Sequence, residues 1–246
     1  MAVSPGGARD DPRRESHYPH HAHREVSGGW LRPSVFGAMD GLVSNFALIS
    51  GVAGGQAEPK TVALAGLAGL AAGAFSMAVG EYTSVASQAE LAQAEIAVER
   101  EELRRRPQAE LRELAELYIS RGVDPDLAYQ VAEQLSKDPE QALKIHSQEE
   151  LGVDPHSLPS PRVAAVSSFI SFAFGAMVPL LPYLLGASSL WPALVLALLG
   201  LFGTGALVSR VTARGWLYSG MRQMLLGAAA AGLTYLFGSA VGAGLS

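Results

Sequence analysis

The chain contains no cysteine, and this absence excludes several kinds of chemistry at once. Disulfides, iron–sulfur clusters, thiolate metal sites and thiol nucleophiles all require a cysteine thiol. Charged residues are also scarce, at 17% of the 246 residues against about 25% in typical soluble domains. If the protein binds metal, the ligands must be oxygen, imidazole or thioether groups.

Lysine and arginine are absent from five long apolar stretches. A helix needs about 20 apolar residues to cross the hydrocarbon core of a bilayer. The stretches that qualify are 33–55, 61–82, 163–186, 190–209 and 223–244. No stretch alternates in the way that is typical of a strand. The sequence therefore predicts an all-α membrane protein with five transmembrane helices.

The basic residues predict which side of the membrane each segment faces. They gather in the tail 1–32, in the segment 83–158 and between the fourth and fifth stretches, and they are missing from the C-terminus. Segments rich in Lys and Arg face the cytoplasm. We expect the tail and the segment 83–158 to be cytoplasmic and the C-terminus to lie outside. No secretory signal is present in the tail. We expect the plasma membrane of a bacterium; a vacuolar membrane would have the same sidedness.

Acidic residues are concentrated in one segment of the chain. Of the 23 Asp and Glu residues, 17 lie between Glu81 and Asp154. The pattern there predicts helices, and no Gly or Pro separates the second apolar stretch from the first of them. The sequence therefore predicts four parts: a disordered tail at 1–32, two transmembrane helices at 33–82, a cytosolic acidic helical insert at 83–158 and three transmembrane helices at 159–246.

Two apolar stretches carry polar side chains. Asp40 lies within the first stretch, with Ser44 on the same helical face and Asn45 beside it. A carboxylate at the centre of a membrane helix costs about 2.5–3.5 kcal/mol, so such residues usually face a partner or a water-filled path. In the second stretch, Met77 and Glu81 are four residues apart and share one face. We regard these five residues as a candidate transport pathway.

The insert carries carboxylates at helical spacing. Clustered carboxylates repel one another, and a divalent cation relieves that repulsion. The candidate metal ligands are Glu99, Glu102, Glu110, Glu113, Glu150 and His146. A solvated helix face with the ion pairs Glu101–Arg105 and Glu102–Arg106 explains the same pattern. The pattern alone favours this second interpretation.

Other motifs are weak or missing. A cluster of four histidines in the tail, His17, His20, His21 and His23, could gather metal but has no fixed geometry. The chain has no Glu-x-x-His pair of a di-iron bundle, no Walker loop and no His-Glu-x-x-His or Gly-x-Ser-x-Gly motif. Basic residues with interleaved aromatics are also missing, so we expect no nucleic-acid partner. We expect that the protein is not an enzyme.

Two long motifs resemble those of a known family. They are Asp40-Gly-Leu-Val-Ser-Asn-Phe46, continuing to Gly51-Val-Ala-Gly54, and Gly73-Ala-Phe-Ser-Met-Ala-Val-Gly-Glu-Tyr82, continuing to Ser87-Gln-Ala-Glu90. Both are similar to the signature segments of the vacuolar iron transporter family, and the chain resembles a bacterial-type member. The resemblance implies a homodimer with five transmembrane helices per subunit. It also implies export of Fe²⁺, often Mn²⁺, from the cytosol in exchange for protons, with no permanently bound cofactor.

The resemblance also assigns roles to residues. It implies that the pathway lies at the dimer interface, with its aspartate at Asp40 and its methionine at Met77. It implies a cytosolic three-helix metal-binding domain whose glutamates are Glu99, Glu102, Glu110, Glu113 and Glu150. Plant members carry a second membrane acid where this chain has Gly69, and Glu81 is a candidate to replace it. They also carry two methionines where this chain has His146 and Ser147.

Three functions follow as hypotheses. The first is a proton-coupled exporter of divalent metal, in which the insert collects the ion and Glu81 and Met77 pass it to Asp40. The second is a membrane-anchored metal sensor or storage protein that does not transport. The third is a membrane enzyme such as a ferroxidase, which the missing Glu-x-x-His pairs argue against.

Overall fold

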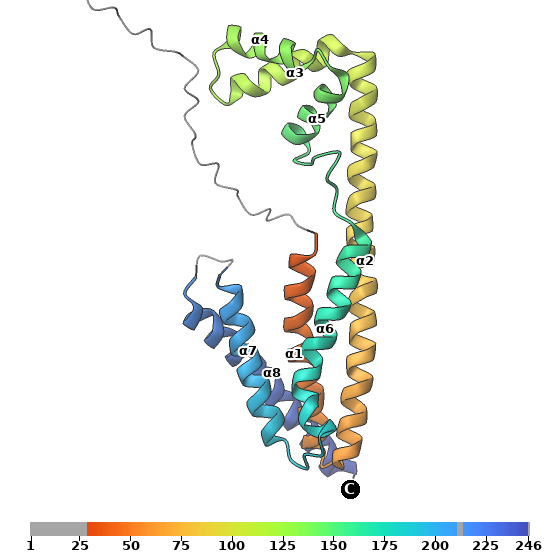
Figure 1. The fold of residues 1–246 in the computed structure, drawn as a ribbon, viewed down its shortest axis with the longest axis vertical. Helices are drawn as coiled ribbons and strands as arrows, with labels where there is room; N and C mark the ends of the chain where they lie inside the picture. The colour runs from red at the N-terminus through yellow and green to blue at the C-terminus, as the bar shows by residue number, and fades with distance from the viewer. Residues whose placement is uncertain (1–28, 211–213, 246) are drawn as a thin grey trace, which may run out of the picture.

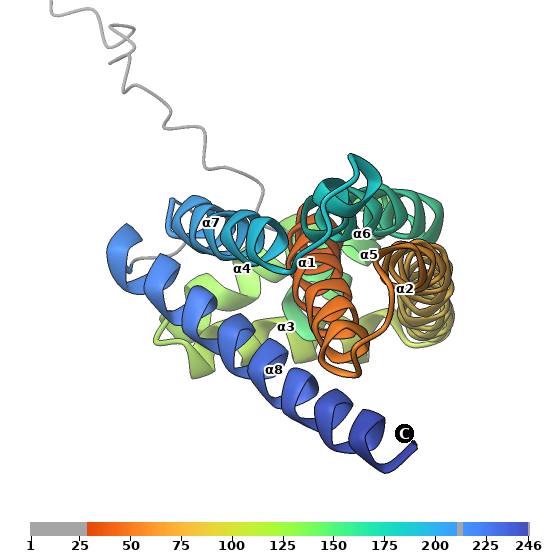
Figure 2. The same ribbon diagram turned by 90° about the horizontal axis from the view of Figure 1, so that it is seen from below.

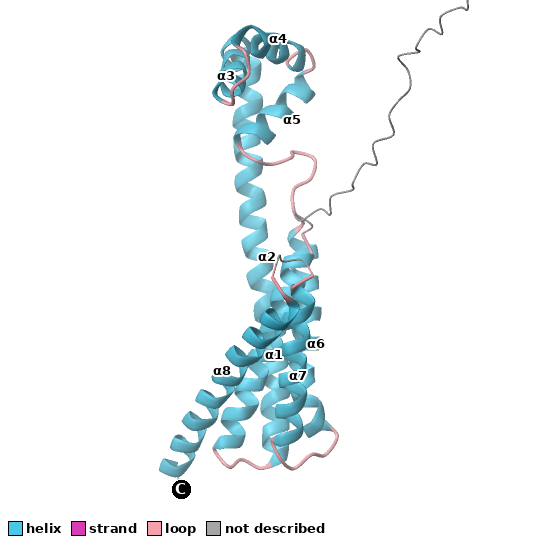
Figure 3. Cartoon of the chain, turned by 90° about the vertical axis from the view of Figure 1, so that its left-hand side faces the viewer, coloured by secondary structure: helices cyan, strands magenta, loops and turns pink. Residues whose placement is uncertain are grey.

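The structure is built from helices. The computed structural model describes residues 29–210 and 214–245, and no strand occurs within these two ranges (Figure 3). The helices are α1 (Leu31–Gly54), α2 (Pro59–Arg105), α3 (Pro107–Ser120), α4 (Pro125–Leu135), α5 (Pro139–Glu150), α6 (Pro161–Leu184), α7 (Trp191–Val208) and α8 (Trp216–Leu245). The histidine cluster of the tail lies outside the described residues.

The predicted all-α membrane fold is confirmed. Five helices are long and apolar enough to cross a bilayer, namely α1, α2, α6, α7 and α8. They correspond in order to the five apolar stretches of the sequence. Figure 1 shows them as one bundle, with the short helices α3, α4 and α5 well away from it at the far end of α2.

One boundary was predicted wrongly. The expected fifth span begins at residue 223, and Arg222 was placed in a polar turn, but α8 already begins at Trp216. The guanidinium carbon of Arg222 lies 5.9 Å from the ring centroid of Tyr218, one helical turn earlier. This cation–π contact accommodates an arginine on an interfacial helix. Arg222 therefore lies within the helix and does not precede it.

Helix α2 extends from the bundle into the insert. It is continuous over 47 residues, as the lack of Gly and Pro between Glu81 and Arg106 predicted. At 1.5 Å per residue this is about 70 Å, more than twice the thickness of a bilayer core. Two of the insert helices begin at Asp-Pro pairs: Asp124 caps α4 and Asp138 caps α5, each accepting backbone N–H groups of the first turn. The insert is therefore attached to the bundle through α2 and the segment 151–160.

Helix α1 is the central helix of the bundle. It packs against α2, α6, α7 and α8, and Figure 2 shows it surrounded by them. Leu42 and Phe46 of α1 form a buried cluster with Ala197 and Leu201 of α7 and Ala231 of α8. Helix α8 contacts α1 and α7, where the Thr234 hydroxyl donates a hydrogen bond to the Ala47 carbonyl oxygen (2.8 Å). The polar residues of α1 are thus held among four neighbours.

The Gly69-x-x-x-Gly73 motif packs within the chain. A Cβ atom at Gly69 would collide with Leu48 of α1, and one at Gly73 would collide with the Phe172 ring of α6. Small residues let helices approach closely in lipid, where dispersion rather than the hydrophobic effect drives association. The motif therefore brings α2 close to α1 and α6.

Candidate functional site

A cavity of about 240 Å³ lies between the first two membrane helices. It gathers four of the five candidate pathway residues in one place. Its lining consists of Asp40, Ser44, Asn45 and Leu48 of α1, Gly69, Gly73, Ser76 and Met77 of α2 and Phe172 of α6. Gly69 and Gly73 present no side chain, so the glycine motif that draws the helices together also leaves this space open.

The polar side chains of α1 offer oxygen atoms to this cavity. The Ser44 hydroxyl donates to the backbone carbonyl oxygen of Asp40 (2.6 Å), which uses its only proton and leaves its lone pairs free. Asp40 itself is half-buried. A carboxylate and a hydroxyl oxygen on one helix face are hard ligands of the kind that bind divalent cations.

Asn45 is held in a fixed orientation. Its Nδ2 donates a hydrogen bond to the Ala176 carbonyl oxygen of α6 (2.7 Å), and only 2% of the residue is exposed. Its Oδ1 is buried and accepts no hydrogen bond within the described chain. The oxygen lies beside Gly69, where a Cβ atom would be 3.0 Å from it. A buried amide oxygen without a donor is costly, so a cation or water in the cavity is its natural partner.

Glu81 is separate from the cavity. It lies one turn beyond Met77 toward the insert, is 8% exposed and does not line the cavity. Its Oε2 is buried and has no hydrogen-bond partner among the described residues. Glu81 therefore lies between the cavity and the insert, and the structure does not place it beside Asp40.

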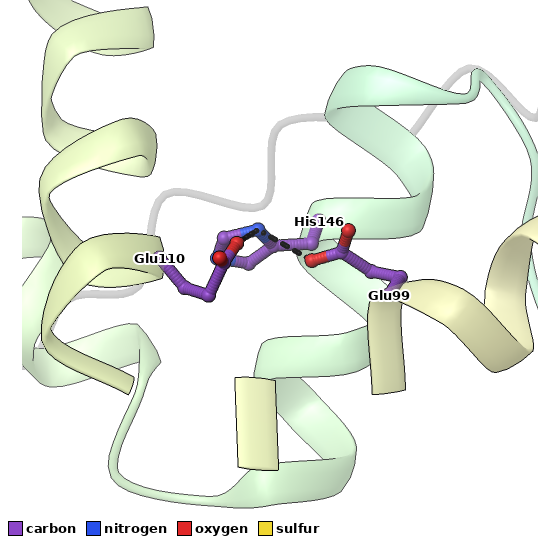
Figure 4. A group of neighbouring side chains, drawn as sticks. All are labelled: Glu99, Glu110 and His146. Atoms are coloured by element: carbon purple, nitrogen blue, oxygen red, sulfur yellow. Dashed lines mark ion pairs between the residues drawn. The ribbon is translucent and has the colours of Figure 1, made fainter. Parts of the chain in front are cut away.

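A second group of candidate ligands meets in the insert. Glu99 of α2, Glu110 of α3 and His146 of α5 each offer one ligand atom, and these atoms lie within 4.8 Å of one another. Figure 4 shows the two carboxyl groups on either side of the imidazole. The His146 Nδ1 is 3.0 Å from Glu99 Oε1 and 3.9 Å from Glu110 Oε2. All three residues are buried.

The other predicted ligands surround this cluster. Glu150 Oε1 lies 2.9 Å from His146 Nδ1, one helical turn away on α5. Glu102 and Glu113 are exposed, but their charges repel those of Glu99 and Glu110. The structure thus brings all six candidate ligands of the insert to the place where α2, α3 and α5 meet.

The carboxylates of the cluster are difficult to ionise together. Burial, followed by repulsion from Glu150 and Glu110, raises the pKa of Glu99 to about 7. Burial and then repulsion from Glu113 also raise the pKa of Glu110. Glu99 Oε1 is buried and accepts no hydrogen bond, although it lies 3.0 Å from the imidazole. A divalent cation would relieve both the repulsion and the missing bond.

One of the two ion pairs expected from the solvated-face interpretation is present. Glu101 pairs with Arg104 (2.7 Å) and Arg105, so the expected Glu101–Arg105 pair is present. The expected Glu102–Arg106 pair is absent among the described ion pairs, since Arg106 lies beyond the end of α2. The clustered glutamates form no ion pair with a Lys or Arg in the described chain. Glu149, which pairs with Arg121, lies nearby and is not one of them.

Some parts of the cavity had no signal in the sequence. Phe172 closes it from α6, more than 120 residues from Asp40, and the Ala176 carbonyl orients Asn45. Both depend on how α6 packs against α1 and α2. Ser76 lies inside a motif that the sequence singled out, but only the helix pairing shows that it faces the cavity.

Known proteins resemble this chain over most of its length. The model of the VIT family matches residues 31–239. "Vacuolar iron transporter 1" of Oryza sativa subsp. japonica is 31% identical over 238 residues, covering 94% of this chain and 93% of that protein. The protein of the same name from Arabidopsis thaliana is 30% identical, covering 94% of both chains. "Vacuolar iron transporter" of Acanthamoeba castellanii is 46% identical over 162 residues, or 65% of this chain and 58% of that protein.

The raised pKa of Glu99 predicts that cation binding to the insert displaces a proton. The metal-free fold retains a proton on Glu99 between its ordinary pKa of 4.5 and about 7, where the unfolded chain has lost it. The stability of the metal-free insert should therefore fall as pH rises through this interval. Mn²⁺ binding to the full chain at pH 6 should release a proton that is not released at pH 8, measured by calorimetry in buffers of different ionisation enthalpy.

Glu99→Gln should abolish this proton release and weaken binding. Glu101→Gln is the matched control, because a hydrogen bond from Arg104 lowers the pKa of Glu101 to about 2 and the group is ionised at both pH values. Unchanged proton release in Glu99→Gln would contradict the assignment.

Proposed function

This chain belongs to the VIT family, and we propose that it is a membrane transporter of divalent iron that moves Fe²⁺ out of the cytosol. The observation that carries this proposal is the cavity between α1 and α2. It combines the Asp40 carboxylate, the Asn45 amide oxygen and the Met77 thioether inside a membrane bundle. A carboxylate is kept at such a position when it has a function that offsets the cost of burial.

The ligand set suits a cation of intermediate softness. Carboxylate and amide oxygens favour hard cations, and a thioether favours soft ones. Fe²⁺ lies between these limits. We propose Mn²⁺ as a second transported ion, since the oxygen ligands accept it equally well and geometry more than affinity sets selectivity.

We propose that protons are exchanged for the metal. When the cation leaves the cavity, Asp40 would remain as an unpaired charge inside the bilayer. A proton entering from the other side neutralises it. Glu81 is buried, lacks a hydrogen-bond partner in the described chain and lies next on the way from the insert. It is our candidate for the second group that exchanges a proton for a metal ion.

The insert serves as a reservoir on the cytoplasmic side. Glu99 and Met77 lie on the same helix, 22 residues apart, which corresponds to about 33 Å. This distance is too long for direct transfer between ligands. We propose that the cluster of Glu99, Glu110, His146 and Glu150 concentrates the ion near the membrane, and that the ion reaches Glu81 through water.

We propose that two copies of the chain form the transporter. Ser44 and Ser76 line the cavity and are exposed on the side of the bundle. A polar opening of this kind is unfavourable against lipid tails. A second copy facing the same helices would cover it and enclose the path between two subunits. We place the complex in a bacterial plasma membrane, with the insert in the cytosol and the C-terminus outside.

The direct test is transport by purified protein in liposomes. With Fe²⁺ on one side and a pH gradient, wild-type protein should move Fe²⁺ and protons together, measured with fluorescent reporters of each. Asp40→Ala should reduce both fluxes to the level of empty liposomes, because the only carboxylate of the cavity is lost. Glu58→Gln should transport normally, because Glu58 is an exposed acid at the N-cap position of α2, at the end of this helix away from the insert.

The outcomes separate the competing functions. Full flux in Asp40→Ala would exclude this pathway. Stoichiometric metal binding by a wild-type chain that moves no ion would favour the sensor or storage protein. Oxygen consumption on addition of Fe²⁺ would favour the ferroxidase.

The reservoir role predicts a specific kinetic change. Glu99→Gln combined with Glu110→Gln should raise the Fe²⁺ concentration at half-maximal flux several-fold and leave the maximal flux close to wild type. A residue that only supplies ions affects the response to concentration more than turnover. Glu101→Gln should change neither parameter. Loss of the maximal flux in the double variant would instead place the cluster within the pathway itself.

The free oxygen of Asn45 predicts opposite effects for two substitutions. Asn45→Ala removes a cation ligand and should raise the half-saturating Fe²⁺ concentration by about tenfold, the equivalent of one charge-assisted contact. Asn45→Asp keeps an oxygen at this position and should retain binding. Ser168→Ala is the control, because it removes a buried hydroxyl that has no hydrogen-bond partner among the described residues and that lies outside the cavity. If Asn45 only joins α1 to α6, both Asn45 variants should be equally impaired.

A further inference from the structure

The C-terminal part of the chain contains basic side chains but no acidic side chains. Residues 155–246 include four arginines and no Asp or Glu; the arginines are Arg162, Arg210, Arg214 and Arg222. None of the ion pairs formed by the described residues involves them. Two of the four, Arg210 and Arg214, follow α7 and precede α8. The end of α7 and the start of α8 lie at the end of the bundle that faces the insert (Figure 1). The counter-ions of these arginines must come from outside this segment.

A cavity of about 590 Å³ lies beside these two arginines. Its lining is Gly203, Ala206, Leu207, Ser209, Arg210, Arg214, Gly215 and Trp216, with no acidic residue. A Cβ atom at Gly203 or Gly215 would meet no other atom within 4 Å, so both residues border open space. The cavity is therefore accessible and has a positive charge at one end.

The part of the cavity wall that α7 forms is apolar. Gly203, Ala206 and Leu207 follow i, i+3, i+4 spacing, which places them on one face of α7, and Arg210 lines the same cavity two residues beyond the end of this helix. Leu207 is 60% exposed on this face. From Arg210 the face leads back along α7 into the membrane. A ligand that fits must be anionic at one end and apolar along the rest.

Trp216, the first residue of α8, lines the same cavity as the two arginines. It is 61% exposed, and its ring meets Phe202 of α7 edge to face at 6.0 Å between centroids. Tryptophan is enriched at the membrane–water interface, where its ring is partly in lipid and its N–H can reach polar groups. The contact with Phe202 fixes the ring beside the two arginines.

We propose that this corner binds one anionic phospholipid. Its phosphate lies between Arg210 and Arg214, and an acyl chain follows the Gly203, Ala206 and Leu207 face of α7. Arginine suits a phosphate because its planar guanidinium donates two parallel hydrogen bonds. Basic pockets at the cytoplasmic ends of membrane helices bind anionic headgroups in this way. The site is independent of metal transport.

The test compares two lipids with the same acyl chains. The full chain in detergent is titrated with dioleoylphosphatidylglycerol and with dioleoylphosphatidylcholine, and bound lipid is counted by native mass spectrometry. Wild-type protein should bind the anionic lipid more tightly, with about a fivefold contribution from each arginine. Arg210→Gln with Arg214→Gln should lose this preference. Arg222→Gln, outside the cavity and stacked on Tyr218, should keep it.

Further arms decide between this site and simpler explanations. Arg210→Lys with Arg214→Lys retains the charges and should keep most of the preference, which guards against a folding defect in the Gln variant. Inorganic phosphate at millimolar concentration should not displace the lipid, because it lacks the acyl chain. Equal binding of both lipids by wild-type protein would overturn the proposal. An equal loss in Arg222→Gln, or displacement by inorganic phosphate, would do the same.

Discussion

The uninterrupted hydrogen-bond ladder of α2 determines the geometry of the whole molecule. From Pro59 to Arg105 no residue breaks the helix, so one rigid element passes through the membrane and continues into the insert. Because a straight helix fixes the distance between its residues, Met77 and Glu99 are held about 33 Å apart. The two candidate metal sites cannot merge. They are separate sites joined by one helix, and this separation is the reason why we propose storage at one and passage at the other.

Both sites contain polar atoms that the protein alone leaves unsatisfied. In the membrane, α6 holds the Asn45 amide so that its oxygen has no donor among the described residues, and Asn45 lines the same cavity as Asp40. In the insert, Glu99 and Glu110 are buried so close together that ionisation of both is unfavourable. Buried polar atoms without partners are rare because they are costly. Asn45 lines the membrane cavity, and Glu99 and His146 belong to the insert cluster, so a bound cation is one explanation that serves the unpartnered atoms at both places.

Much of the fold could be predicted because the bilayer imposes a simple rule. Apolar length predicted five spans, and the lack of Gly and Pro beyond Glu81 predicted that α2 continues into the insert. The start of α8 was missed because interfacial arginine is compatible with a helix. The sites were predictable as residue types but not as arrangements. His146 meets Glu99 only because α5 folds back against α2, and spacing along one helix does not encode that contact.

The central claim is that the protein binds its cation at two places, one inside the membrane and one in the insert. The most direct measurement is anomalous scattering from crystals of the full chain saturated with Mn²⁺. The account predicts one peak in the cavity between Asp40 and Met77 and a second among Glu99, Glu110 and His146, about 30 Å apart along α2. Saturated crystals with a peak in the insert and none in the membrane cavity would contradict it.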